Sequence, residues 1–222
     1  HTQHQRPRSQ RAAMDRHCHL RASRPLRLRL YPQGGPRLLP QSAMLHIICR
    51  GNNDTRIFRN RYDFDRLKNT LLRFTCDIDF FIHHYVLMNT HFHLLAWLED
   101  TTHVANVIKA VTISYHHYYR RKYGYKGHLW HGRYRSIVIQ SDEQWSQCGR
   151  YIELNPVYAG ICKDPADFPW SSYHHYTTDK EDILVRNIFQ TNPDNQYRQF
   201  TLAGIDLEYR KLKKEFERKN TW

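Results

Sequence analysis

The stretch Val86–Trp97, which reads VLMNTHFHLLAW, decides the fold, because an apolar run here carries the two histidines His91 and His93. Side chains of a β-strand alternate between the two faces of a sheet, so both histidines point to one face and Phe92 points to the other. Leu95 continues the histidine side. Two imidazoles on one face, one pleat apart, can bind a single metal ion.

The histidine triplet alone is weak evidence for a metal site. Chance alone explains such a spacing in a chain with 16 histidines among 222 residues, and His17–His19 is a second instance. That second triplet lies among Arg and Ser without an apolar pattern, so no rigid element is expected to orient it. The triplet in the strand therefore needs a third ligand from elsewhere in the chain.

Length and composition favour one domain with appendages, and the chain is long enough to bury a core. It has no uninterrupted apolar run of membrane-spanning length, and its polar, Arg-rich start lacks the apolar region of a signal peptide. The five cysteines are scattered, odd in number and without a CxxC pair. These features predict a reduced, cytoplasmic protein with no membrane partner.

The net charge of +13 favours a polyanionic partner. Residues 1–34 hold eight Arg and one Asp, so about half of this excess lies in a segment without hydrophobic periodicity. We expect residues 1–40 to be a disordered or poorly ordered basic extension. Between residues 115 and 135, Arg and Lys are interleaved with Tyr, a pattern suited to nucleic acid. The alternative is a solvated cationic face.

Hydrophobic periodicity predicts an α+β domain over residues 41–175. Strands are expected at 43–51, 78–88, 91–98 and 135–140, and helices at 58–75, 104–123 and 141–154, the last stopped by Pro156. The order β-α-β-β-α-β matches a ferredoxin-like antiparallel sheet with helices on one face, followed by one more helix. Residues 176–222 are expected to form a charged, partly helical tail, with helical material at 206–219.

The helix expected at 141–154 holds a second polar pair. Tyr151 and Asn155 are four residues apart and therefore neighbours on one helical face. A phenol one turn before an amide oxygen can place a nucleophile beside a metal ligand. The alternative is that Tyr151 is half-buried packing and Asn155 an ordinary helix end before proline.

Four segments carry a resemblance to a known family: VLMNTHFHLLAWL (86–98), GHLWHGRYRSIVIQ (127–140), RYIELNPVYAGI (150–161) and DFPWSSY (167–173). Together they resemble the tyrosine transposases, and most of all the branch called REP-associated tyrosine transposases, which is related to the IS200-type transposases. These are HUH single-strand DNA endonucleases, named for the His-hydrophobic-His triplet. The resemblance covers about residues 36–175 in order.

The resemblance implies roles for individual residues. His91 and His93 match the metal ligands, Tyr151 matches the nucleophile, and Asn155 takes the place of the third ligand, which is Gln in the IS200-type relatives. The implied cofactor is a divalent metal ion, Mg²⁺ or Mn²⁺. Tyr158 stands where the family usually has Arg, so a phosphate contact at that position is not expected.

The implied activity is a metal-dependent single-stranded DNA endonuclease and strand transferase that cleaves at hairpin-forming repeats through a 5′-phosphotyrosine intermediate. We expect the protein to be nucleoid-associated, and both a monomer and a homodimer remain open. Two alternatives are a catalytically silent DNA-binding protein of the same fold and a metal-dependent hydrolytic nuclease. The expected DNA contacts are Arg50, Tyr118, Tyr119, Arg120, Arg121, Lys122, Trp130, Arg133 and Arg135.

Overall fold

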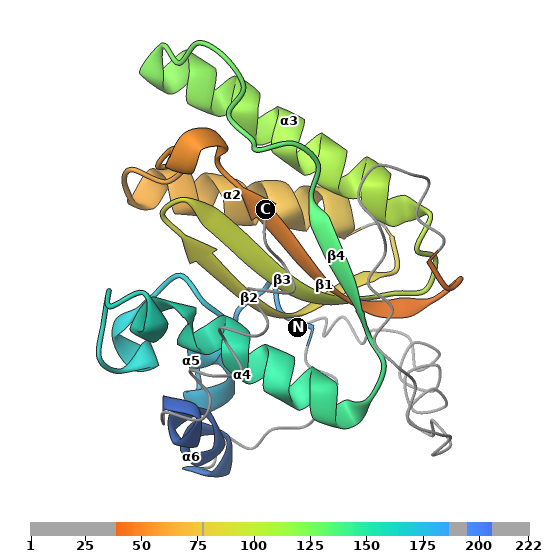
Figure 1. Cartoon of the computed structure of the whole chain (residues 1–222), viewed down its shortest axis with the longest axis vertical. Helices are drawn as coiled ribbons and strands as arrows, with labels where there is room; N and C mark the ends of the chain where they lie inside the picture. Colours follow the sequence, from red (N-terminus) through yellow and green to blue (C-terminus); the bar gives the residue numbers. More distant parts are fainter. Residues whose placement is uncertain (1–38, 77, 187–194, 206–222) are drawn as a thin grey trace, which may run out of the picture.

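The computed structural model describes residues 39–76, 78–186 and 195–205. Its centre is a four-stranded antiparallel sheet in the order β2-β3-β1-β4 (Figure 1). The strands are β1 (Ala43–Arg50), β2 (Phe80–Met88), β3 (His91–Leu98) and β4 (Arg135–Ile139). The expected ferredoxin-like α+β arrangement is confirmed. Nearly all of the extension expected at 1–40, and the helical material expected at 206–219, lie outside the described residues.

Helices cover both faces of this sheet (Figure 1). On one face lie α2 (Arg61–Thr75) and α3 (His103–Tyr123), and on the other lie α4 (Asp142–Tyr158), α5 (Tyr173–Thr177) and α6 (Asn195–Leu202). Short 3₁₀ turns occupy Asn52–Asp54, Pro165–Asp167 and Ala203–Ile205. Among the described helices, none combines the length and the apolarity needed to cross a bilayer.

Helix α2 shows why the sequence folds this way locally. The Asn60 side chain caps its first turn and Asp63 reaches back to the backbone of Asn60, a reciprocal capping box that satisfies amides without helical partners. Phe64, Leu67 and Leu71 follow at helical spacing and are buried against the sheet. The helix is therefore amphipathic, with its apolar stripe facing the core.

The alternation predicted for β3 is observed. Phe92 and Leu94 belong to the core between the sheet and helices α2 and α3. Leu95 belongs to a smaller core on the other face, together with Cys148 and Ile152 of α4. The histidine face of β3 is therefore the face that α4 covers.

The outer edge of β2 is covered by chain that follows α4. The amide of Leu87 donates to the carbonyl of Trp170 at 2.9 Å, and the amide of Ser172 donates to the carbonyl of Tyr85 at 3.0 Å. These bonds satisfy an edge that is otherwise open to pairing with another chain. They also fix the start of α5 beside the sheet.

The expected end of α4 at Pro156 is wrong. The helix continues to Tyr158 with Pro156 inside it. A proline in the last turn removes one helical hydrogen bond, and the burial of this turn, which includes Leu154 and Asn155, offsets that loss. The helix ends where Gly160 adopts a φ of 69°, a left-handed conformation that glycine accepts without strain.

Packing does not stop at the domain end expected at residue 175. Tyr176, Leu184 and Val185 join the larger core. Asp182 accepts hydrogen bonds from Lys68 of α2, at 2.8 Å, and from the hydroxyl of Tyr85. The part of the expected tail that the structure describes is thus attached to the domain.

Candidate active site and nucleic-acid interface

The two histidines of β3 lie together on the face that α4 covers. Their ring centroids are 5.1 Å apart. The Nδ1 atom of His91 lies 3.0 Å from the hydroxyl of Thr90, the last residue of the turn between β2 and β3. His93 is buried, with 4% of its surface exposed. The tight hairpin and the antiparallel register thus hold both rings in place.

A third histidine, His46 of β1, contacts this pair. Its Nε2 lies 2.9 Å from Nδ1 of His93, and the two rings stack at 5.2 Å with an interplanar angle of 24°. Complete burial lowers the pKa of His46 to about 3, so its imidazole is uncharged at neutral pH. Sequence reasoning missed this residue, because a histidine in the apolar run at 43–51 does not by itself indicate its partner.

Tyr151 approaches the histidine face from α4. Its ring lies edge-on to two imidazoles, with centroids 5.9 Å from His93 and 6.0 Å from His46. Helix α4 therefore crosses the histidine side of the sheet within one chain. The phenol thus lies close to His93, one of the metal-ligand candidates.

Asn155 lies one turn after Tyr151 and is buried, with 6% of its surface exposed. Its side-chain Nδ2 donates to the backbone carbonyl of Tyr151 at 2.9 Å. An amide that donates through nitrogen keeps its oxygen for an acceptor or ligand role. The same bond ties the amide to the backbone of the candidate nucleophile.

The donor chemistry fits a divalent cation. His91 and His93 each engage a neighbour through Nδ1, which is how metal-binding imidazoles are held while Nε2 serves as the ligand. Within the described ranges, no three His, Cys, Asp or Glu side chains gather closely enough to hold a metal ion.

A buried carboxylate fixes α4 against the rest of the fold. Glu153, fully buried, accepts hydrogen bonds from Nδ1 of His84 at 2.9 Å, from the hydroxyl of Ser172 at 2.8 Å and from the hydroxyl of Tyr197 at 2.7 Å. These partners come from β2, the start of α5, and α6. Burial, together with the nearby Glu153 carboxylate, raises the pKa of Tyr197, so this hydroxyl remains a donor.

The same helix approaches the sheet very closely. A Cβ added at Gly149 would meet Nε2 of His84 at 2.7 Å. Glycine therefore lets the backbone of α4 lie directly on the His84 ring. Together with Glu153, this contact sets the depth at which Tyr151 lies over the histidines.

The DNA-contact candidates on α3 fall into two groups. Arg120 and Arg121 are exposed, whereas the Tyr119 side chain is fully buried and its hydroxyl donates to the carbonyl of Arg56 at 2.8 Å. Tyr119 is a core residue here, because no face of its ring is open to an incoming base. The expected contact of Tyr119 with a DNA base is therefore not possible while the ring is buried.

Tyr118 and Lys122 join α3 to α2 through Asp63. The Tyr118 hydroxyl donates to the Asp63 carboxylate at 2.8 Å, and Lys122 Nζ donates to it at 2.7 Å. Burial alone raises the pKa of Asp63, but hydrogen bonds from Lys122 and the Tyr123 hydroxyl hold it below its ordinary value. Both side chains therefore have a structural partner.

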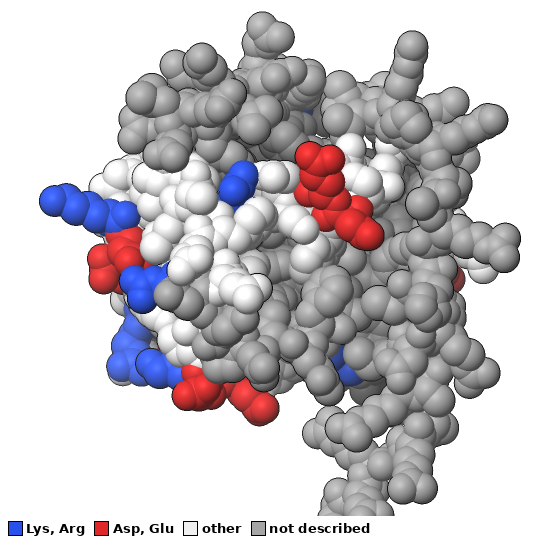
Figure 2. All heavy atoms as spheres, turned by 90° about the horizontal axis from the view of Figure 1, so that it is seen from below, with Lys and Arg blue, Asp and Glu red and all other residues white. Residues whose placement is uncertain are grey.

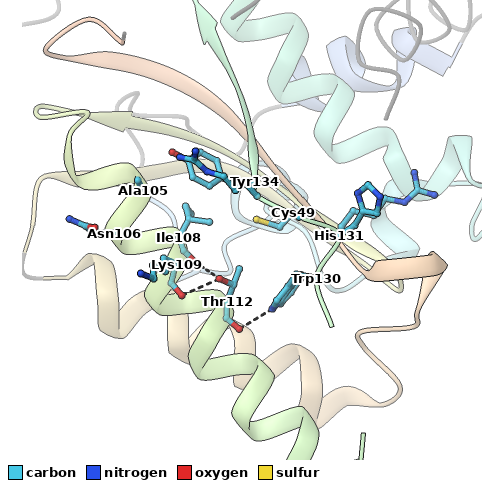
Figure 3. A pocket seen from close by; sticks show the side chains of 12 residues that line it. Cys49, Ala105, Asn106, Ile108, Lys109, Thr112, Trp130, His131 and Tyr134 are labelled. Atoms are coloured by element: carbon cyan, nitrogen blue, oxygen red, sulfur yellow. Dashed lines mark hydrogen bonds between the residues drawn. The ribbon is translucent and has the colours of Figure 1, made fainter. Parts of the chain in front are cut away.

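A pocket of about 360 Å³ lies between α3 and the segment that leads into β4 (Figure 3). It brings together three expected DNA contacts, Arg50, Trp130 and Arg133. The Trp130 indole is fixed by a hydrogen bond of 2.9 Å from its Nε1 to the carbonyl of Thr112. The lining also includes Lys109, His131 and Tyr134, which sequence reasoning did not select.

Arg50 and Arg135 occupy the strands beside the histidines. Arg50 pairs in register with His91, and Arg135 pairs with Ile48. Arg50 also forms an ion pair with Asp54 in the following turn. Alternation places both arginines on the sheet face that carries the histidines.

The side of the molecule that carries α4 has mixed charge where it is described. Figure 2 shows this side with Lys and Arg atoms close to Asp and Glu atoms at its left margin, a separate group of Asp or Glu atoms at the upper right, and a largely uncharged area between these two groups. Of the expected DNA contacts, Arg50, Trp130 and Arg133 line the pocket in Figure 3, whereas Arg120 and Arg121 lie in the last turn of α3, outside its lining.

Comparisons with known proteins give consistent results. A family model described as "Transposase IS200 like" matches residues 41–155. A solved structure of a REP-associated tyrosine transposase bound to a REP hairpin matches with a TM-score of 0.56 at 16% identity, over 72% of this chain and 100% of that one. At this identity the likeness concerns the fold.

A second solved structure, of a putative transposase from Deinococcus radiodurans, matches with a TM-score of 0.38 at 17% identity, over 55% of this chain and 96% of that one. No curated protein matches the sequence.

Proposed function

This chain belongs to the IS200-like transposase family, and from that membership we propose that it is a metal-dependent, single-stranded DNA endonuclease and strand transferase. The observation that carries the proposal is the approach of Tyr151 to His93, at 5.9 Å between ring centroids, within one chain. A nucleophile candidate and a metal-ligand candidate from distant segments meet on one face of the sheet.

Tyr151 acts as the nucleophile in this proposal. Its phenolic oxygen forms a bond to the scissile phosphorus, and the bond from phosphorus to the 3′ oxygen breaks. The phenol proton is lost to solvent, and the departing 3′ oxygen gains a proton to become a free hydroxyl. The enzyme then holds a 5′-phosphotyrosine. Attack by another 3′-hydroxyl reverses the step and joins a new strand without ATP.

His91, His93 and Asn155 hold the divalent cation, Mg²⁺ or Mn²⁺. The bound cation supplies neutralisation of phosphate charge, which a phenol with an ordinary pKa of about 10 needs at neutral pH. The chain's own part is orientation. The Thr90 hydroxyl and the His46 ring hold the two imidazoles, and the Tyr151 carbonyl holds the amide of Asn155.

The DNA-binding surface in this proposal is the pocket between α3 and the segment before β4, together with the exposed Arg120 and Arg121. Arg and Lys follow the phosphates, while the Trp130 ring offers a stacking face, worth roughly 1–3 kcal/mol per base. The solved relative with this fold holds a REP hairpin. We therefore extend the proposal to hairpin-forming repeats as substrate and to the nucleoid as the place of action.

The test is formation of a covalent adduct. The wild-type protein is incubated with Mn²⁺ and labelled single-stranded DNA that carries a hairpin repeat, and products are separated on a denaturing gel. We expect a protein–DNA adduct with the wild type and none with Tyr151→Phe. Tyr62→Phe is the matched control, because Tyr62 is 68% exposed on α2 and should leave the adduct unchanged.

The outcomes separate the alternatives. Cleavage without any adduct would indicate a hydrolytic nuclease that uses water. Binding without cleavage, in Mn²⁺ and in Mg²⁺, would indicate a catalytically silent DNA-binding protein. Replacement of both His91 and His93 by Ala should abolish cleavage while hairpin binding persists, and cleavage that survives EDTA would defeat the metal assignment.

A further inference from the structure

His46 contacts both His93, a metal-ligand candidate, and Tyr151, the nucleophile candidate, but has neither role itself. Its side chain is fully buried in β1. One edge of the ring places Nε2 2.9 Å from Nδ1 of His93, and the ring also lies 6.0 Å from that of Tyr151 at an interplanar angle of 72°. A single side chain thus contacts both a metal-ligand candidate and the nucleophile candidate.

Core packing alone does not account for an imidazole at this position. In the two flanking strands, the residues paired with His46 are Leu95 and Ile137, which are both apolar and buried. A buried polar ring is unfavourable unless it is hydrogen-bonded, so a leucine or phenylalanine would fill the space at lower cost. The bond to His93 is what distinguishes histidine from those residues.

The hydrogen bond restricts the tautomer of His93. A neutral imidazole has one N–H and one nitrogen with a lone pair, and the partner of one nitrogen determines which is which. When Nδ1 of His93 carries the proton and donates it to Nε2 of His46, the lone pair of His93 lies on Nε2. That nitrogen can then bind a cation.

We propose that His46 is a positioning residue, which accepts the Nδ1–H of His93, commits Nε2 of that ring to the divalent cation, and packs against the ring of Tyr151. The proposal rests on the proposed function, since it concerns the same site. It assigns His46 no contact with the DNA or the metal. As a consequence, the affinity for the metal ion depends on the hydrogen bond between His46, which is not a ligand, and the ligand candidate His93.

Two substitutions separate the hydrogen bond from the shape of the ring. His46→Phe keeps a flat ring against His93 and Tyr151 but removes the acceptor. His46→Gln loses the ring but can place an amide oxygen near the position of Nε2. His103→Phe is the matched control. His103 is exposed at the start of α3, which follows the Leu98 end of β3, whereas His91 lies at the other end of that strand.

The primary measurement is Mn²⁺ affinity of the full chain without DNA, by electron paramagnetic resonance of free Mn²⁺, with circular dichroism and melting curves of the metal-free proteins alongside. His46→Phe should melt as a folded protein and bind Mn²⁺ about 10- to 100-fold more weakly, the usual loss when a metal ligand's supporting partner is removed. His46→Gln should recover most of that affinity. His103→Phe should match the wild type.

Wild-type Mn²⁺ affinity in folded His46→Phe would overturn the proposal, as would equal loss in the Phe and Gln variants. A wild type that binds no Mn²⁺ would overturn it as well. Adduct formation is measured in parallel, and it distinguishes failure of the positioning role of His46 from failure of the proposed function. If the wild type forms no adduct but His46→Phe still loses Mn²⁺ affinity and Gln restores it, the positioning role stands and the proposed function fails.

Discussion

Replacement of Glu153 by Gln tests how α4 is held over the histidines. The carboxylate is fully buried and accepts three hydrogen bonds, from His84, Ser172 and Tyr197. One oxygen, Oε1, accepts from both His84 and Ser172, and the other, Oε2, accepts from Tyr197. Because the donors come from β2, the start of α5, and α6, the carboxylate joins four parts of the chain.

The magnitude follows from the three bonds. Gln has nearly the volume of Glu, but only one of its two terminal atoms accepts, and it carries no charge. Hydrogen bonds to a charged group contribute about 1.5–3 kcal/mol each, against about 0.5–1.5 kcal/mol for neutral pairs. Loss of about 1 kcal/mol in each bond predicts a destabilisation of about 3 kcal/mol. Glu153→Ala should be worse, at about 3–5 kcal/mol or more, since it leaves the donors unpaired and opens a cavity.

The assay is urea unfolding followed by circular dichroism at neutral pH. With an m-value of about 2–3 kcal/mol/M, a loss of 3 kcal/mol corresponds to a midpoint lowered by about 1–1.5 M. Glu143→Gln, an exposed position in the first turn of the same helix, is the matched control and should change the free energy of unfolding by about 0.5 kcal/mol at most. A Glu153→Gln midpoint equal to that of the control would refute the reasoning.

Three further predictions concern other parts of the molecule. The pKa of Asp63 is lowered in the folded protein, so its carboxylate stabilises the fold above the ordinary pKa of about 3.9, and this contribution is lost as pH falls through the lowered value. Asp63→Asn should therefore lower the urea midpoint at pH 7, and the midpoint of this variant should fall less steeply below pH 4 than that of the wild type. Midpoints that fall in parallel in the two proteins would contradict this. Arg133→Ala should weaken hairpin binding and reduce the slope of log affinity against log salt by about 1, and an unchanged slope would remove Arg133 from the interface. A mixture of Tyr151→Phe and His93→Ala chains should form no adduct, whereas restored adduct on the gel would show a site shared between chains.

The sequence was informative wherever periodicity and pairing decide the structure. Alternation along residues 91–98 placed the two histidines on one side and Phe92 on the other, and the structure shows this arrangement. The four-residue spacing of Tyr151 and Asn155 placed them on one side of a helix. The family resemblance, more than the spacing, connected this pair with the two histidines as parts of one site.

Features that depend on tertiary packing could not be predicted from the periodicity of the sequence. Tyr119 lies in an aromatic and basic stretch that predicts a surface, yet its ring is buried and its hydroxyl binds the carbonyl of Arg56. Pro156 predicts the end of a helix, but the burial of the last turn overrides that local preference. His46 lies in an apolar run, and nothing local in that run shows that its partner is another histidine 47 residues away.

The histidines of β3 and Tyr151 of α4 come together because the strand and the helix are each fixed by separate interactions. Antiparallel register sets His93 beside Ile48 of β1 and Val86 of β2, so the ligand face is fixed by backbone hydrogen bonds. Helix α4 is fixed by Glu153, two residues after Tyr151. Release of the helix would expose a buried carboxylate and break its bonds to three other elements, and breaking such a buried polar cluster costs several kcal/mol. We therefore expect Tyr151 to act on the metal site of its own chain, since an exchange of α4 between chains has to break this cluster first.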